Sequence, residues 1–73
     1  MKKYIIYTKE KGKIETDNLY DVGGLTLHRE DGPAYQGFYD NGQLFHEAYY
    51  INGELYTKSN YDAEVFKMKF PLL

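Results

Sequence analysis

The 73-residue sequence contains no cysteine and only two histidines, His28 and His46. A chain without cysteine forms no disulfide, and two histidines are too few for the common structural zinc sites. Domains of this size often depend on one of these two supports. We therefore expect a core made of side chains alone, with neither a metal ion nor a cofactor. The absence of cysteine also fits a reducing compartment, so we expect a cytoplasmic protein.

Long apolar runs are absent as well. The longest run is far too short to cross a bilayer, and the residues after Met1 lack the apolar stretch and cleavage site of a secretory signal. We therefore expect no membrane partner and no export.

Aromatic residues, by contrast, are abundant: nine tyrosines and four phenylalanines bring the aromatic content to 18%. Such a content excludes a disordered chain, because these rings bury enough apolar surface to offset the loss of chain entropy. The length allows one domain at most. We expect a single folded domain with a core rich in aromatic rings.

The formal net charge of -2 is distributed unevenly. Lysines dominate residues 1–14, whereas residues 15–57 contain many acids and a single basic residue, Arg29. Binding of nucleic acid depends on a basic surface that neutralises phosphates, so the acidic middle argues against direct binding of DNA or RNA. It suits either a basic protein partner or an ordinary solvated surface.

Two Asn-Gly dipeptides, Asn41-Gly42 and Asn52-Gly53, are strong signals for two-residue β-hairpin turns. Asp31-Gly32 is a weaker signal, because Pro33 follows it. The segments between the turns are rich in Tyr, Phe, Ile and Leu, which favours strands. An eleven-residue repeat, 37–47 and 48–58, has the length of one strand plus one turn. We predict a mostly β fold, an antiparallel meander of five or six strands near residues 3–9, 13–20, 25–28, 34–40, 43–51 and 54–58.

The C-terminal part has the pattern of a helix. Ser59 and Asp62 have the spacing of a capping box, and Tyr61, Val65 and Met68 recur on one helical face. We predict a C-terminal α-helix over 60–69 that ends before Pro71 and packs on one face of the sheet. The single domain then comprises an N-terminal hairpin (1–23), a meander (24–58) and a C-terminal helix (59–70).

Counting outward from the two Asn-Gly turns predicts which side chains share a face of the sheet. The first face contains Tyr35, Tyr39, Leu44, His46, Ala48, Tyr50 and Leu55. The second contains Gln36, Phe38, Phe45, Glu47, Tyr49, Ile51, Tyr56 and Lys58. The first face includes smaller residues at its repeat positions, so we expect it to be the core beneath the helix.

The second face then leaves a surplus of rings outside the core. We predict that Phe38, Phe45, Glu47, Tyr49 and Tyr56 form a partner-binding site, because tyrosine combines a rigid apolar body with a polar tip and is enriched at interfaces. Two alternatives remain open. The rings stabilise the sheet by cross-strand stacking, or they form a homodimer interface.

Catalytic chemistry has little support in the sequence. Ser59, the single serine, is better explained as a helix cap than as a nucleophile, and the adjacent Glu30 and Asp31 make a poor acid–base pair. His28 and His46 could ligate a metal with Glu30 or Glu47, but they lack a convincing ligand spacing. No glycine-rich motif for phosphate leads into a helix. We expect no enzymatic activity.

The segment His28–Ala34 reads His-Arg-Glu-Asp-Gly-Pro-Ala and is followed by the two Asn-Gly hairpins. This combination, over roughly residues 24–58, resembles the MORN-like variant repeat, a family common in phage and other viral proteins. The segment 35–42 also resembles the opening of a MORN repeat. The resemblance implies a single-layer antiparallel sheet, often closed by a C-terminal helix, and a module for interactions rather than catalysis.

Together these patterns predict a small non-enzymatic protein-binding module. The resemblance further implies a phage-encoded stoichiometric inhibitor of a host protein, for instance an anti-CRISPR or a similar anti-defence protein. The alternatives are a structural homodimerisation module without a host target and a binder of a small signalling nucleotide, for which only the N-terminal lysines offer a basic cluster.

Overall fold

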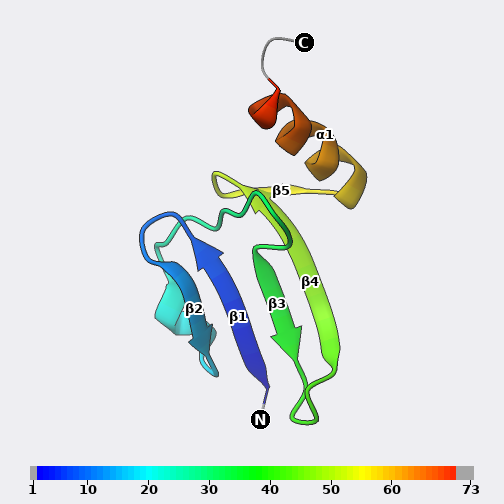
Figure 1. Cartoon of the computed structure of the whole chain (residues 1–73). Coiled ribbons are helices and arrows are strands. Elements are labelled where there is room, and N and C mark those ends of the chain that lie inside the picture. The colour runs from blue at the N-terminus through cyan, green and yellow to red at the C-terminus, as the bar shows by residue number, and fades with distance from the viewer. Residues whose placement is uncertain (1, 71–73) are drawn as a thin grey trace.

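The computed structural model describes residues 2–70, which form five strands, one short 3-10 helix and one α-helix (Figure 1). The elements are β1 (Lys3–Thr8), β2 (Gly12–Thr16), η1 (Leu19–Val22), β3 (Tyr35–Phe38), β4 (Leu44–Ile51), β5 (Glu54–Tyr56) and α1 (Lys58–Lys69). The strands form a single sheet in the order β2-β1-β3-β4-β5, with antiparallel neighbours throughout. The prediction of a mostly β fold with a C-terminal helix packed against an antiparallel sheet is confirmed.

The strand order shows one departure from a simple meander. β1 pairs with both β2 and β3, so the connection between β2 and β3 passes β1 before the chain re-enters the sheet. The predicted strand 13–20 is shorter than expected. The Asn18 side chain accepts a hydrogen bond from the Tyr20 amide and begins η1 where that strand was to continue.

The predicted strand 25–28 is not a strand of the sheet, but the backbone of this segment forms hydrogen bonds with residues on both sides of it. The amides of Lys9 and His28 link this segment to β1, donating to Thr26 and Tyr7 at 2.9 and 3.0 Å. On the other side, the Gly53 amide donates to Leu27 at 2.8 Å, and the Arg29 amide donates to Tyr50 at 3.1 Å. Residues 26–29 therefore lie between the ends of β1 and β4, in line with β3.

The two Asn-Gly turns differ in structure. At the second turn Asn52 and Gly53 both have positive φ, 52° and 81°, as a type I′ turn requires. The predicted pairing of Tyr50 with Leu55 and of Tyr49 with Tyr56 is confirmed there. The predicted pairing of Glu47 with Lys58 is wrong, because Lys58 already belongs to α1.

The first turn, at Asn41-Gly42, is a three-residue loop. Gly42 has a positive φ of 87°, whereas Asn41 does not have a positive φ. The Gly42 amide donates to Tyr39, and the Tyr39 amide donates to Gln43, both at 2.9 Å. The longer loop and a register shift beside Phe38 place Phe38 opposite Leu44, so the predicted pairings of Phe38 with Phe45 and of Tyr39 with Leu44 are wrong. Pairing of Tyr35 with Ala48 and of Gly37 with His46 is confirmed.

Helix α1 begins two residues before the predicted start. The hydroxyl of Thr57, not that of Ser59, caps it by accepting from the Asn60 amide at 3.2 Å. Tyr61 is 4% exposed, whereas Met68 on the same predicted face is 41% exposed. Figure 1 shows the reason: the first turn of α1 lies close to β5, and the rest projects away from the sheet. Pro71, the predicted helix stop, lies outside the described residues.

Tyr61 joins the helix to the loop 28–34. Its hydroxyl lies within hydrogen-bond distance of the carbonyl oxygens of Arg29 and Gly32, 2.9 Å from the latter, and accepts from the Gly32 amide at 3.2 Å. Its ring packs on that of Tyr49, with centroids 4.8 Å apart. One side chain therefore satisfies backbone groups of the loop and positions the helix.

Arg29 shapes the same loop from the sheet side. Its guanidinium carbon lies 3.9 Å from the centroid of the Tyr7 ring, a cation–π geometry. Nε donates to the Asp31 carboxylate at 2.8 Å, and Nη1 donates to the Pro33 carbonyl at 3.0 Å. This hydrogen bond and the charge of Arg29 hold the pKa of the exposed Asp31 carboxyl below its ordinary value. The loop is thus ordered from within as well as by the helix.

Removing the Tyr61 hydroxyl tests this linkage. We expect Tyr61→Phe to lower the free energy of unfolding by about 1–3 kcal/mol, because partly buried backbone groups of Arg29 and Gly32 lose their partner. Urea denaturation measures the change. Tyr20→Phe, at a side chain that is 93% exposed, is the matched control and should change stability by less than about 0.5 kcal/mol. Equal stability of Tyr61→Phe and the wild type would contradict the role of the hydroxyl.

Alkaline pH gives a second test of the same group. Burial raises the pKa of the Tyr61 hydroxyl above its ordinary value, so the folded state favours the neutral phenol. This contribution is fully present below the unfolded pKa of about 10 and is lost as pH rises through the folded value. Between about pH 8 and about pH 11, the wild type should lose more stability than Tyr61→Phe in denaturant titrations. Parallel losses in the two proteins would contradict this assignment.

Candidate protein-binding surface

The five residues predicted to bind a partner do not form one surface. Phe38 lies opposite Lys3 and Leu44, so these three side chains share a face. Phe45 is the extra residue at the register shift and lies on the other face, against Gly37 and Tyr4. The bulge therefore divides the predicted site, because an added residue moves the side chains beyond it to the opposite face.

Phe45 lies across β3 at a position that only glycine leaves free. A Cβ atom added at Gly37 would lie 2.6 Å from Cζ of Phe45 and 3.3 Å from the Tyr4 ring. The Phe45 ring also contacts Tyr39, with centroids 5.0 Å apart, and Lys2 Nζ lies 4.8 Å from its centroid. Gly37 therefore leaves free the space that the Phe45 ring occupies.

Tyr49 and Tyr56 are cross-strand partners on β4 and β5, as predicted, but α1 covers Tyr49. The Tyr61 ring lies on it, and Lys58 Nζ is 5.7 Å from its centroid. The prediction that the helix packs on the first face, that of Tyr35 and Tyr50, is therefore wrong. The helix packs on the face of Tyr49, where Tyr61 reaches the backbone of the loop 28–34. Glu47, the remaining predicted residue, is exposed on β4.

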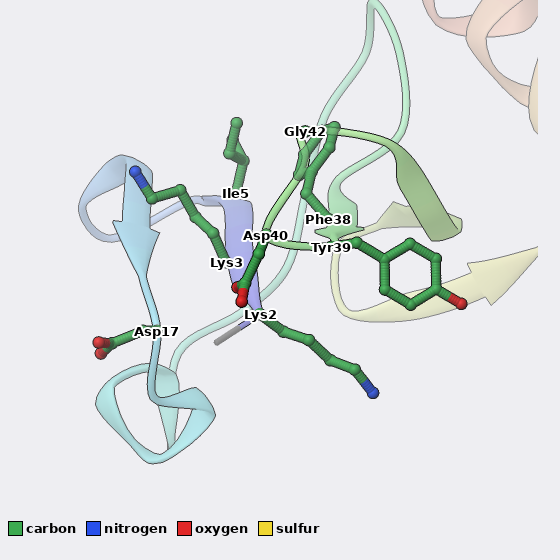
Figure 2. Close-up of a pocket in the computed structure, with 8 residues that line it drawn as sticks. All are labelled: Lys2, Lys3, Ile5, Asp17, Phe38, Tyr39, Asp40 and Gly42. Atoms are coloured by element: carbon green, nitrogen blue, oxygen red, sulfur yellow. The ribbon is translucent and has the colours of Figure 1, made fainter.

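Phe38 lines an open depression of about 580 Å³ at the N-terminal end of β1 (Figure 2). Lys3 and Asp17 lie on its β2 side, and the Tyr39 side chain extends to the other side (Figure 2). Ile5 and Phe38 supply apolar surface between these polar groups. The depression combines both signs of charge, so it shows no preference for an anion or a cation.

The first face carries an almost continuous row of rings. Centroids are 5.0 Å apart between Tyr39 and Phe45, 6.1 Å between Phe45 and Tyr4, 6.0 Å between Tyr4 and Tyr35, and 5.4 Å between Tyr35 and His46. These separations are within the range of favourable aromatic pairs. We call this row, with the neighbouring Tyr50 and Leu55, the open aromatic face; its residues are Tyr4, Tyr35, Tyr39, Phe45, His46, Tyr50 and Leu55.

The open aromatic face is substantially accessible. Tyr39 is 49% exposed and Leu55 is 62% exposed, while Tyr4, Tyr35, Phe45 and Tyr50 are half-buried. Burial raises the pKa of the Tyr35 hydroxyl above its ordinary value. Near β2 the same face is bordered by η1, where the Thr16 hydroxyl bonds to the Asp21 carboxylate. The rings over β3 and β4 lie beyond that border.

Counting outward from the turns correctly grouped Tyr35, Tyr39, His46, Tyr50 and Leu55 on one face, but the helix does not cover that face. Leu44, predicted on the same face, lies instead on the face of Phe38. Tyr4 was missed. Its place depends on the pairing of β1 with β3, which joins segments about thirty residues apart in the chain, and no local turn signal reports that pairing.

Other kinds of site find no support in the described part of the chain. Across residues 2–70, no three His, Asp or Glu side chains gather closely enough to hold a metal ion. No helix in that range has both the length and the apolar character needed to cross a membrane.

Comparison with protein-family models, with curated proteins and with solved structures finds no match for this chain. The resemblance of His28–Ala34 to a MORN-like variant repeat therefore stays a prediction. In the structure that segment is the loop held by Arg29 and Tyr61.

The fit of Phe45 over Gly37 can be tested by a double-mutant cycle. Gly37→Ala should destabilise the protein by about 1–3 kcal/mol, because the added Cβ overlaps the Phe45 ring. In a Phe45→Ala background the same change should cost far less, since the overlapping ring is gone. Thermal or urea unfolding of the four proteins measures the coupling. Equal costs of Gly37→Ala in both backgrounds would contradict this contact.

Proposed function

We propose that this protein is a small non-enzymatic protein-binding module whose contact surface is the open aromatic face. One observation carries the proposal: a row of neighbouring rings on one side of the sheet remains half-exposed while the helix packs on the other side. Contiguous apolar patches that stay exposed on a small folded domain commonly mark sites of interaction with other proteins.

The chemistry of the patch supports a protein rather than a small molecule as the ligand. Tyr39 and Tyr35 offer apolar rings with hydroxyl tips, which form contacts at low cost in side-chain entropy. Their neighbours across the sheet, Phe45 and His46, make a broad surface rather than a deep pocket. Broad surfaces with a few aromatic anchors are typical of protein–protein interfaces.

The identity of the partner is proposed from the resemblance alone. The His28–Ala34 segment resembles repeats common in phage proteins, which supports a phage origin and a host protein as the partner. In that setting the module acts stoichiometrically, in the manner of an anti-CRISPR or a similar anti-defence protein. Stoichiometric binding needs no catalytic group, in keeping with a surface made of rings.

Binding by the open aromatic face is testable with exposed residues whose loss spares the core. We expect Tyr39→Ser combined with Leu55→Ser to keep the fold, by circular dichroism, and to weaken partner binding at least about tenfold, as loss of interface anchors does. Affinity purification from infected or producing cells, followed by titration of the recovered partner, measures the effect. Tyr20→Ser, at an exposed side chain of η1, is the control and should bind as the wild type does.

Sedimentation velocity of the wild type separates the proposal from homodimerisation. We expect a monomer, with the open aromatic face accessible to a partner. A tight dimer that the Tyr39→Ser, Leu55→Ser variant dissociates would show that a second copy covers this face, and would contradict the proposal. So would a partner that the variant binds as tightly as the wild type.

A further inference from the structure

β4 is much longer than the strand beside it. β5 pairs only with Tyr49, Tyr50 and Ile51, at the end of β4. The stretch Leu44–Ala48 has β3 on its inner side and, among residues 2–70, no strand on its outer side. Figure 1 shows this lower part of β4 as the free margin of the sheet, with β5 and α1 confined to its upper end.

The direction of the backbone groups follows from bonds to the inner side. The Ala48 and Tyr50 carbonyls accept from the amides of Ala34 and Arg29, so the backbone polar groups of these two residues of β4 point towards the β3 side of the strand. In an antiparallel sheet successive residues alternate between the two neighbouring strands. Glu47 therefore directs its N–H and C=O outward, beyond the point where β5 ends at Tyr56. These are the groups that an added strand would pair with.

The two margins of the sheet are protected in different ways: β2 has outward-facing charged residues, whereas β4 has the bulge at Phe45 and the single charge of Glu47. β2 places Lys13 and Glu15 next to each other on the outer edge, with their charged groups 3.8 Å apart. Charged side chains, lysine above all, are the usual device that keeps edge strands from pairing with other chains. The stretch Leu44–Ala48 contains neither lysine nor proline, and its one charged residue is Glu47.

A groove of about 550 Å³ runs beside this edge, at the junction of β4, β5 and the start of α1. Glu47 and Ala48 line it from β4, Leu55 and Tyr56 from β5, and Lys58 from the helix. Lys58 forms an ion pair with Asp62, with Nζ and Oδ2 2.8 Å apart. Its positive charge is therefore balanced within the helix and does not offset the negative charge of Glu47. The acidic side chain at the edge favours a basic residue in whatever lies alongside.

We propose that the outer edge of β4, over Leu44–Ala48, binds an extended segment of a partner protein as an added antiparallel or parallel strand, with a Lys or Arg side chain next to Glu47. Main-chain hydrogen bonds would supply affinity, and the groove and Glu47 would select side chains. The inference rests on the proposed function and adds the kind of segment that the partner presents.

Proline at Glu47 provides a selective test. The ring removes an amide that points away from β3, a position at which edge strands accept proline. Glu15→Pro is the matched control. The Tyr7 amide donates to Ala34, on the β3 side of β1, so the backbone N–H and C=O of the next residue, Ile6, point towards its β2 partner Ile14. The backbone groups of Ile14 point back towards β1. Those of Glu15 therefore point outward from β2, as those of Glu47 do from β4. Both variants should retain the wild-type circular dichroism spectrum.

The probe is a capped synthetic heptapeptide of alternating lysine and valine, compared with its glutamate–valine counterpart and with a version N-methylated at alternate residues. Titrations followed by amide NMR should shift Phe45–Ala48 in the wild type and in Glu15→Pro, and leave Glu47→Pro unshifted. The glutamate peptide should bind at least about tenfold more weakly.

Three results would overturn the inference: no shifts at β4 with the lysine peptide, equal binding of the N-methylated peptide, or self-association through β4 that Glu47→Pro abolishes. Its failure is distinguishable from that of the proposed function. A partner lost by the Tyr39→Ser, Leu55→Ser variant but bound normally by Glu47→Pro would leave the aromatic interface standing and remove the strand-docking edge.

Discussion

The arrangement of this protein depends on the contact between Tyr61 and the loop 28–34. In a chain of this size few side chains are buried, and Tyr61, Ile6, Ala34 and Ile51 make up the buried apolar core among residues 2–70. Tyr61 is the member that comes from the helix, and its hydroxyl meets backbone groups of Arg29 and Gly32. Polar groups that are buried need partners, so this contact determines which face of the sheet the helix covers. The opposite face keeps its rings accessible because the helix is held elsewhere.

The same contact explains the loop's own composition. Arg29 lies over Tyr7 and bonds to Asp31 and Pro33, while Gly32 leaves space for the guanidinium, since a Cβ there would lie 2.9 Å from its central carbon. The unusual sequence of this segment is therefore accounted for by packing and hydrogen bonding inside the protein. Its residues position the helix and the sheet, and the proposed contact surfaces lie on β3, β4 and β5.

Local signals in the sequence predicted the local structure well. Asn52-Gly53 forms the expected type I′ turn, and the strands and the helix occur near their predicted places. Asn41-Gly42 misled because the same dipeptide also fits a three-residue loop in which glycine alone has positive φ. That difference, with the bulge at Phe45, moved one predicted site residue to the other face. The choice of face by the helix, and the place of Tyr4, depend on contacts between distant segments that alternation along a strand does not report.

The most direct test of the account is the position of the Tyr61 ring relative to the sheet, measured by nuclear Overhauser effects between assigned aromatic protons. The structure predicts contacts between the rings of Tyr61 and Tyr49, whose centroids are 4.8 Å apart, and none between Tyr61 and Tyr35. Contacts of Tyr61 with Tyr35 or Tyr50 would place the helix over the rings of the first face. The open aromatic face would then be core, and the proposed interface would be contradicted.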